Sequence, residues 1–181
     1  MVRPDRAATA RERYLRYFIT FTCYGARLHG DESGSVDRHH NLVGNRLLEP
    51  DVQRVAAERR AMLQGPYVLN ATDRAIVLAA IQNHCAYRGW NLAAAHVRSN
   101  HVHAIVEAEA PPERIMNEFK SYASRELNRL TTTGGSERKR WARHGSTRWL
   151  WKDEDVKRAL QYVVDELGEP IALFIADEIR T

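Results

Sequence analysis

The stretch WNLAAAHVRSNHVHAIVEA, residues 90–108, contains two strand-like runs, 90–97 and 101–108, on either side of Arg98-Ser99-Asn100. Two such runs around a short turn that contains Asn predict a β-hairpin. Side chains alternate across a strand, so His101 and His103 point to the same side. Two neighbouring imidazoles are costly to bury without a partner. The hairpin therefore carries the first candidate site.

The segments around this hairpin predict an α+β fold. Aromatic and β-branched residues favour strands at 16–25 and 145–151. Helical patterns cover 51–64, 73–88, 112–129 and 153–168, with Thr72 as the expected N-cap of the second helix and Gly89 at its end. This order predicts a central antiparallel β-sheet with packed helices.

Length and composition fit one domain over residues 1–181. We expect a flexible N-terminal arm at 1–13, a long loop at 26–50 and a flexible basic linker at 130–144.

The formal net charge of +4 is compatible with nucleic acid, but many unrelated proteins share it. Cys23 and Cys85 lack ligand-like spacing and predict reduced core residues of a cytoplasmic protein. Neither a secretory signal nor an apolar run of about 18 residues is found, so no membrane partner is expected.

The histidine pair has two interpretations. In one, a histidine packs in the core while its neighbour is solvated. In the other, both neutral imidazoles bind one divalent ion, and a third ligand comes from elsewhere in the chain. A tyrosine near such a metal could attack a phosphodiester and form a covalent intermediate. Tyr122 and Tyr162 are the helical candidates, and each has a glutamate four residues later, so spacing does not separate them.

A family resemblance favours Tyr162. SNHVHAIV (99–106), the amphipathic helix after it, the aromatic strand and YVVDE (162–166) in the last helix resemble the single-tyrosine HUH transposases. Within that group, residues 14–172 look most like the REP-associated tyrosine transposases, relatives of the insertion-sequence-200 type. The resemblance implies an RRM-like, ferredoxin-like HUH endonuclease core. The family's nucleophile pattern, Tyr-Ile-x-x-Gln or Tyr-Ile-x-x-Asn, falls on Tyr162, Val163 and Glu166, so a carboxylate replaces the amide.

The resemblance also implies a reaction and its site. The protein is expected to be a metal-dependent single-stranded DNA endonuclease and strand transferase that acts through a 5′-phosphotyrosine at hairpin DNA, as a monomer or homodimer. Tyr162 would be the nucleophile, and Mg²⁺ or Mn²⁺ would be bound by His101, His103 and Glu166. A carboxylate suits either ion. Two alternatives stay open: a catalytically inactive, domesticated protein that binds DNA hairpins, and a zinc hydrolase, which needs one more histidine or acid near the pair.

Basic and aromatic residues interleave in SERKRWARHGSTRW, residues 136–149. Cationic side chains neutralise phosphates, and aromatic rings such as Trp141 and Trp149 stack on unpaired bases. The alternative is a solvated basic loop with two core tryptophans. The expected DNA-binding residues are Lys120, Arg138, Lys139, Arg140, Arg143 and Arg148. His96, on the first strand of the hairpin, is expected to pack in the core.

Overall fold

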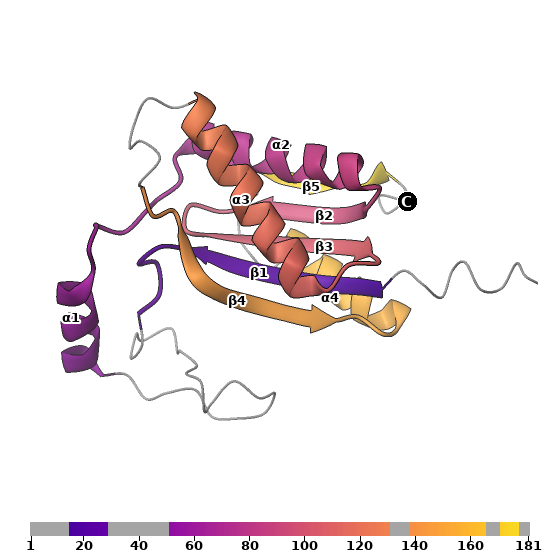
Figure 1. Cartoon of the computed structure of the whole chain (residues 1–181). Helices are drawn as coiled ribbons and strands as arrows, with labels where there is room; N and C mark the ends of the chain where they lie inside the picture. The colour runs from indigo at the N-terminus through magenta and orange to yellow at the C-terminus, as the bar shows by residue number, and fades with distance from the viewer. Residues whose placement is uncertain (1–14, 29–50, 131–137, 166–170, 178–181) are drawn as a thin grey trace, which may run out of the picture.

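The computed structural model describes residues 15–28, 51–130, 138–165 and 171–177 (Figure 1). Its elements are β1 (Leu15–Cys23), α1 (Val52–Ala61), α2 (Ala71–Arg88), β2 (Asn91–Val97), β3 (His101–Ala108), α3 (Pro112–Leu130), β4 (Trp141–Trp149), α4 (Asp153–Asp165) and β5 (Leu173–Ile175). The predicted α+β class is confirmed. The predicted arm at 1–13 and most of the predicted loop at 26–50 lie outside the described residues.

The strands form one antiparallel sheet in the order β4-β1-β3-β2-β5. The predicted hairpin is its β2–β3 unit, in which His96 pairs with His103 and the Arg98 amide donates to the His101 carbonyl at 2.8 Å. β1 lies between β3 and β4, so the hairpin is continuous with the rest of the sheet.

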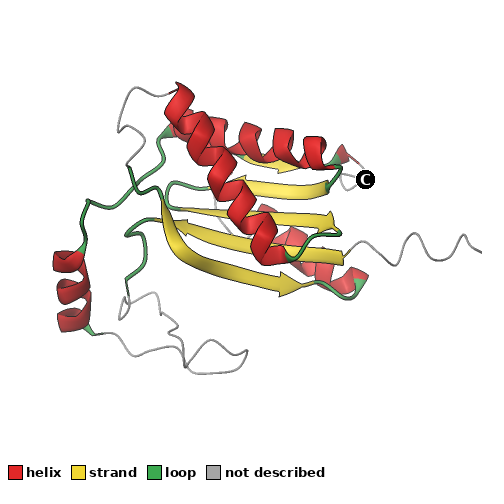
Figure 2. Cartoon of the chain, viewed as in Figure 1, coloured by secondary structure: helices red, strands yellow, loops and turns green. Residues whose placement is uncertain are grey.

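Helices lie on both faces of the sheet (Figure 2), and each face has its own apolar core. On one face, α2 and α3 cover alternate residues of β1, including Tyr17, Ile19 and Phe21. On the other, α4 packs through Ala159 and Val163 on a smaller cluster. Side-chain alternation therefore directs the intervening β1 residues, such as Thr20, toward the α4 side. α1 has no buried residue and stands away from the sheet in Figure 1.

Capping interactions and backbone conformation fix both ends of α2. Asn70, not the expected Thr72, is the N-cap, because its side chain accepts from the Asp73 amide and Asp73 accepts from the Asn70 amide. This reciprocal capping box satisfies two otherwise unpaired amides. Gly89 ends the helix as predicted, with a left-handed φ of 67° that favours glycine.

β4 begins at Trp141 rather than at residue 145, so the end of the predicted linker at 130–144 is ordered strand. The side chain of Lys120, on α3, donates to the carbonyl oxygens of Ala142, Arg143 and His144 and so fixes this part of the strand. Farther along, a Cβ at Gly145 would lie 2.5 Å from the Thr20 carbonyl oxygen, so only glycine allows this close approach to β1.

Cys23 and Cys85 are buried free cysteines, as expected. Among the described helices, none combines the length and hydropathy needed to cross a membrane.

Candidate active site

The two hairpin histidines lie side by side on the α4 side of β3. Their ring centroids are 4.8 Å apart, with the planes at 78°. The Nδ1 atom of His103 is 2.8 Å from Thr20 Oγ1, and the Nδ1 atom of His101 is 2.6 Å from Asn100 Oδ1. An amide oxygen only accepts, so His101 donates through Nδ1 and keeps Nε2 as an acceptor. A hydrogen bond to the ring nitrogen that does not face the metal fixes the orientation of a metal-binding histidine.

Both imidazoles are neutral near pH 7. Burial, assisted by the nearby Arg27 and Arg98 charges, lowers the pKa of His101 to about 4. Burial, together with His101 and His96, lowers the pKa of His103 to about 3. The neutral ring is the form that binds a metal ion. The donor chemistry of the pair therefore fits a divalent cation.

Tyr162 reaches the same place from α4. Its ring meets His103 edge-on at a centroid distance of 5.6 Å and Phe18 at 6.0 Å. Phe18 in turn stacks on His103 at 5.4 Å, so the three rings hold one another in place. The tyrosine is 37% exposed and can be reached from outside.

A cavity of about 530 Å³ opens over this cluster. Three arginines give its wall a cationic character, and Arg158 is paired with Asp155, which also lines the cavity. Arg148 was expected from the sequence to contact DNA. Arg27 and Arg158 were missed, although Arg158 precedes Tyr162 by four residues and so shares its helical face. The lining residues are Phe18, Thr20, Thr22, Arg27, His101, His103, Ser146, Arg148, Asp155, Arg158, Ala159, Gln161 and Tyr162.

A third metal ligand is not found in the described part of the chain. There, no group of three or more His, Cys, Asp or Glu side chains is placed to hold a metal. The expected ligand Glu166 lies outside the described residues. His96 is buried, as expected: its Nδ1–H donates to the Val163 carbonyl at 3.0 Å, and its Nε2 accepts from the Ile171 amide at 3.5 Å.

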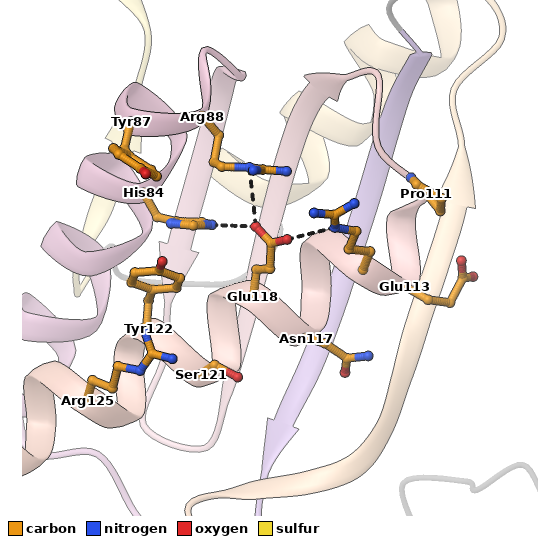
Figure 3. Close-up of a pocket in the computed structure, with 11 residues that line it drawn as sticks. His84, Tyr87, Arg88, Pro111, Glu113, Asn117, Glu118, Ser121, Tyr122 and Arg125 are labelled. Atoms are coloured by element: carbon orange, nitrogen blue, oxygen red, sulfur yellow. Dashed lines mark hydrogen bonds and ion pairs between the residues drawn. The ribbon is translucent and has the colours of Figure 1, made fainter.

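Tyr122 belongs to a different cluster, between α2 and α3 (Figure 3). Its ring stacks on His84 at a centroid distance of 3.9 Å, and the Arg125 guanidinium lies over it at 4.8 Å. His84 also contacts Glu118 at 2.7 Å. Because α2 and α3 cover the face of the sheet opposite α4, Tyr122 is separated from the histidine pair by the sheet.

Two of the expected DNA-binding cations point inward instead. Lys120 is only 8% exposed, and its ammonium is held by the three β4 carbonyls, so it is unavailable for a phosphate. Arg140 is buried with its guanidinium over Tyr67. We correct both assignments: each cation has a structural place. Arg140 lies in a basic segment and was therefore expected to be exposed, whereas Lys120 has helical spacing to the buried Met116 and Ala123 of α3.

The other expected cations lie at or near the surface. Arg138 is half-buried and donates to the Gly65 and Pro66 carbonyls. Lys139, Arg143 and Arg148 are exposed. Trp141 is not a free stacking surface, because it packs edge-on against Phe21 and its Nε1 donates to the Lys120 carbonyl and Ser124 Oγ.

Comparison with known proteins gives the family. No curated protein matches the chain in sequence. Two similar solved structures are a REP-associated tyrosine transposase bound to a REP hairpin (12% identity, TM-score 0.46, covering 82% of this chain) and a proposed transposase from Deinococcus radiodurans R1 (10% identity, TM-score 0.43, covering 90% of this chain). The chain spans 64% of the length of the first and 95% of the second. The family model "Transposase IS200 like" matches residues 55–163, more than half of the 181-residue chain, and the chain therefore belongs to the IS200-like transposase family.

Proposed function

We propose that the protein is a metal-dependent single-stranded DNA endonuclease and strand transferase. The observation that carries this proposal is the position of Tyr162, an accessible hydroxyl beside two neutral histidines in a cavity with three arginines. Membership of the IS200-like transposase family supports DNA cleavage and rejoining as the reaction class.

In this proposal the Tyr162 oxygen attacks a phosphorus of the DNA backbone. The tyrosine hydroxyl loses its proton, a bond forms between its oxygen and the 5′-phosphate, and the bond from phosphorus to the 3′-oxygen breaks. The 3′-oxygen leaves as a hydroxyl group after it gains a proton. A 3′-hydroxyl can later attack the phosphotyrosine and restore a phosphodiester, so the reaction consumes no nucleotide triphosphate.

His101 and His103 would hold the metal, and Mg²⁺ or Mn²⁺ would neutralise charge on the phosphate oxygens. Thr20 and Asn100 orient the two rings through their Nδ1 atoms. We propose Glu166 as the third ligand, because it stands at the amide position of the family's nucleophile pattern, four residues after Tyr162. Arg27, Arg148 and Arg158 attract and orient the phosphates that enter the cavity. We propose single-stranded DNA beside a hairpin as the substrate.

The first prediction concerns the nucleophile. We expect Tyr162→Phe to abolish the protein–DNA adduct that survives denaturing gels, because it removes only the attacking oxygen. Tyr122→Phe, the matched control from the opposite face, should form the adduct at the wild-type rate. The assay uses single-stranded DNA that contains a hairpin with unpaired flanks, such as any palindrome found beside the gene, with Mn²⁺.

The other outcomes separate the competing hypotheses. An adduct that persists in Tyr162→Phe and disappears in Tyr122→Phe would reject the proposed site. Tight hairpin binding without any adduct in the wild-type protein would instead support an inactive, domesticated hairpin-binding protein.

A further inference from the structure

Two tryptophan rings stack on each other at the surface where β4 ends. The centroids of Trp149 and Trp151 are 4.9 Å apart, and their planes are 10° from parallel. Trp149 is 39% exposed and Trp151 is 68% exposed. An indole has a large apolar surface that usually contributes to a core. A stacked, exposed pair is therefore an unusual apolar surface for this cationic protein.

The backbone and the layer beneath hold this pair in place. Trp149 packs edge-on against the buried Tyr17 at a centroid distance of 5.0 Å. Leu150, between the two tryptophans, is buried in the α4-side core, and its amide donates to the Arg16 carbonyl at 2.8 Å. Trp149 and Trp151 therefore have little freedom to move into the core.

The pair lies next to the proposed active site along the chain. Arg148 immediately precedes it and Asp155 follows it closely, and both line the cavity that contains Tyr162. Trp149 pairs with Tyr17, so its ring lies on the α2–α3 side of the sheet, whereas Arg148 lines the cavity on the α4 side. A DNA strand therefore reaches both the cavity and the tryptophans only by passing around β4. β4 is also the edge strand of the described sheet, so a ligand can pass around this edge.

The surrounding charges suit a polyanion with flat, apolar bases. Arg148 and Lys152 are exposed on either side of the pair. Of the three acids in the first turn of α4, Asp153 is paired with Arg16 at 2.6 Å and Asp155 is paired with Arg158. An indole face stacks on any nucleobase, whereas the stacked bases of a duplex do not offer their faces.

We propose that Trp149 and Trp151 form a stacking platform for an unpaired nucleobase of the DNA strand whose phosphodiester enters the cavity. This assignment rests on the proposed function, because it takes single-stranded DNA as the substrate. It assigns base stacking to Trp149 and Trp151 and excludes the packed Trp141.

The test is equilibrium binding of a fluorescein-labelled single strand and of a blunt duplex of the same sequence, without metal, in the Tyr162→Phe background so that no cleavage occurs. We expect Trp151→Ala to weaken single-strand binding roughly 5- to 150-fold, the range that corresponds to the loss of one base–aromatic stack. Trp151→Phe should restore most of this affinity, and duplex binding should change less than about twofold. Tyr87→Ala, which removes another highly exposed aromatic ring from α2, is the matched control and should leave both affinities unchanged.

A 2-aminopurine scan along the strand locates the base. We expect fluorescence quenching at one position close to the cleavage site, and recovery of that signal in Trp151→Ala. Unchanged single-strand affinity in Trp151→Ala, or an equal loss for duplex, would overturn the platform. A shift from dimer to monomer in Trp151→Ala, measured by sedimentation without DNA, would also overturn it, by assigning the pair to a contact between copies.

Adduct formation in the otherwise wild-type protein separates this inference from the proposed function. Normal adduct formation together with unchanged binding in Trp151→Ala would reject the platform and leave the nuclease standing. A Trp151-dependent affinity for single strands without any adduct would reject the nuclease and leave the platform standing.

Discussion

His101 and His103 share one side of a strand, and each ring has its own polar partner at Nδ1. We predict that His101→Ala and His103→Ala each reduce adduct formation by more than roughly 10- to 100-fold, the loss typical when only a hydrogen-bond partner of a metal ligand is removed, because here the ligand itself is removed. DNA affinity measured without metal should remain near wild type. Rates of adduct formation in Mn²⁺ and after chelation provide the measurement.

The control for this pair is His144→Ala, which removes an exposed histidine of β4. It should behave as the wild-type protein. Adduct formation by His101→Ala in chelator-treated buffer would exclude the metal role.

Lys120 gives the second residue-scale prediction, on stability. Lys120→Met leaves three β4 carbonyls without their donor, so we expect a loss of about 1–3 kcal/mol in the free energy of unfolding. Lys157→Met, which replaces an exposed lysine of α4, should change it by less than about 0.5 kcal/mol. Urea denaturation measures both variants.

The pH dependence of the unfolding free energy of Lys120→Met tests whether burial of the Lys120 amine causes the effect. Burial lowers the pKa of Lys120 from 10.5 to about 8, so between these pH values the unfolded chain binds more protons than the native protein. Native stability contributed by this group therefore rises with pH across that window. The free energy of wild type minus that of Lys120→Met should increase from pH 8 to pH 10. If this difference in unfolding free energy does not change between pH 8 and pH 10, Lys120 is not a buried amine that titrates in this range.

At the scale of elements, α4 is held against the hairpin by His96. This buried side chain joins β2 to the Val163 carbonyl, one residue after the proposed nucleophile. We predict that His96→Leu slows adduct formation while single-strand affinity stays within about twofold, because Tyr162 loses its fixed position but the surface cations remain. His96→Asn keeps an N–H donor near the same place and should recover part of the rate.

Adduct kinetics and binding are measured on the same His96 preparations. Equal rates for Leu, Asn and wild type would mean that packing alone positions α4.

The elements differ in how far the sequence could predict them. The β2–β3 hairpin and the helices α2 and α3 follow from local alternation, periodicity and capping, and the structure has them nearly where predicted. The early start of β4 depends on Lys120, 21 residues before Trp141, which is a tertiary contact without a local signal. β5 has three residues, too few to show a period, and was missed.

Some residues of the candidate site could also be predicted from local sequence patterns, whereas others depend on tertiary packing. The histidine pair follows from alternation along one strand, and Arg158 could have been found from its helical spacing to Tyr162. Arg27 and Phe18 enter the cavity only through the three-dimensional packing of β1 and the turn after it. Exposure of the cations was likewise set by tertiary contacts, as Lys120 and Arg140 demonstrate.

At the scale of the whole molecule, the sheet separates two surfaces that both carry arginines. Arg148 lines the cavity on the α4 side, whereas Arg114 is paired with Glu118 on α3, across the sheet. If the DNA phosphates lie in the cavity and along the β4 edge, the cations there release counterions and the cations of α3, such as Arg114, do not. Because the net charge of the protein is only +4, the positions of the arginines on its surface predict DNA binding better than the net charge does.

We therefore predict that the affinity for single-stranded DNA falls with salt and that Arg148→Gln makes this dependence shallower. For single strands, each lost phosphate contact should reduce the slope of log affinity against log salt by about 0.7. Arg114→Gln is the matched control, an exposed arginine of the other surface, and should keep the wild-type slope. Titrations of a labelled strand at several salt concentrations measure all three proteins. A slope reduced equally by both substitutions would mean that DNA phosphates also contact the α3 surface around Arg114, and the path from the cavity around β4 would then be wrong.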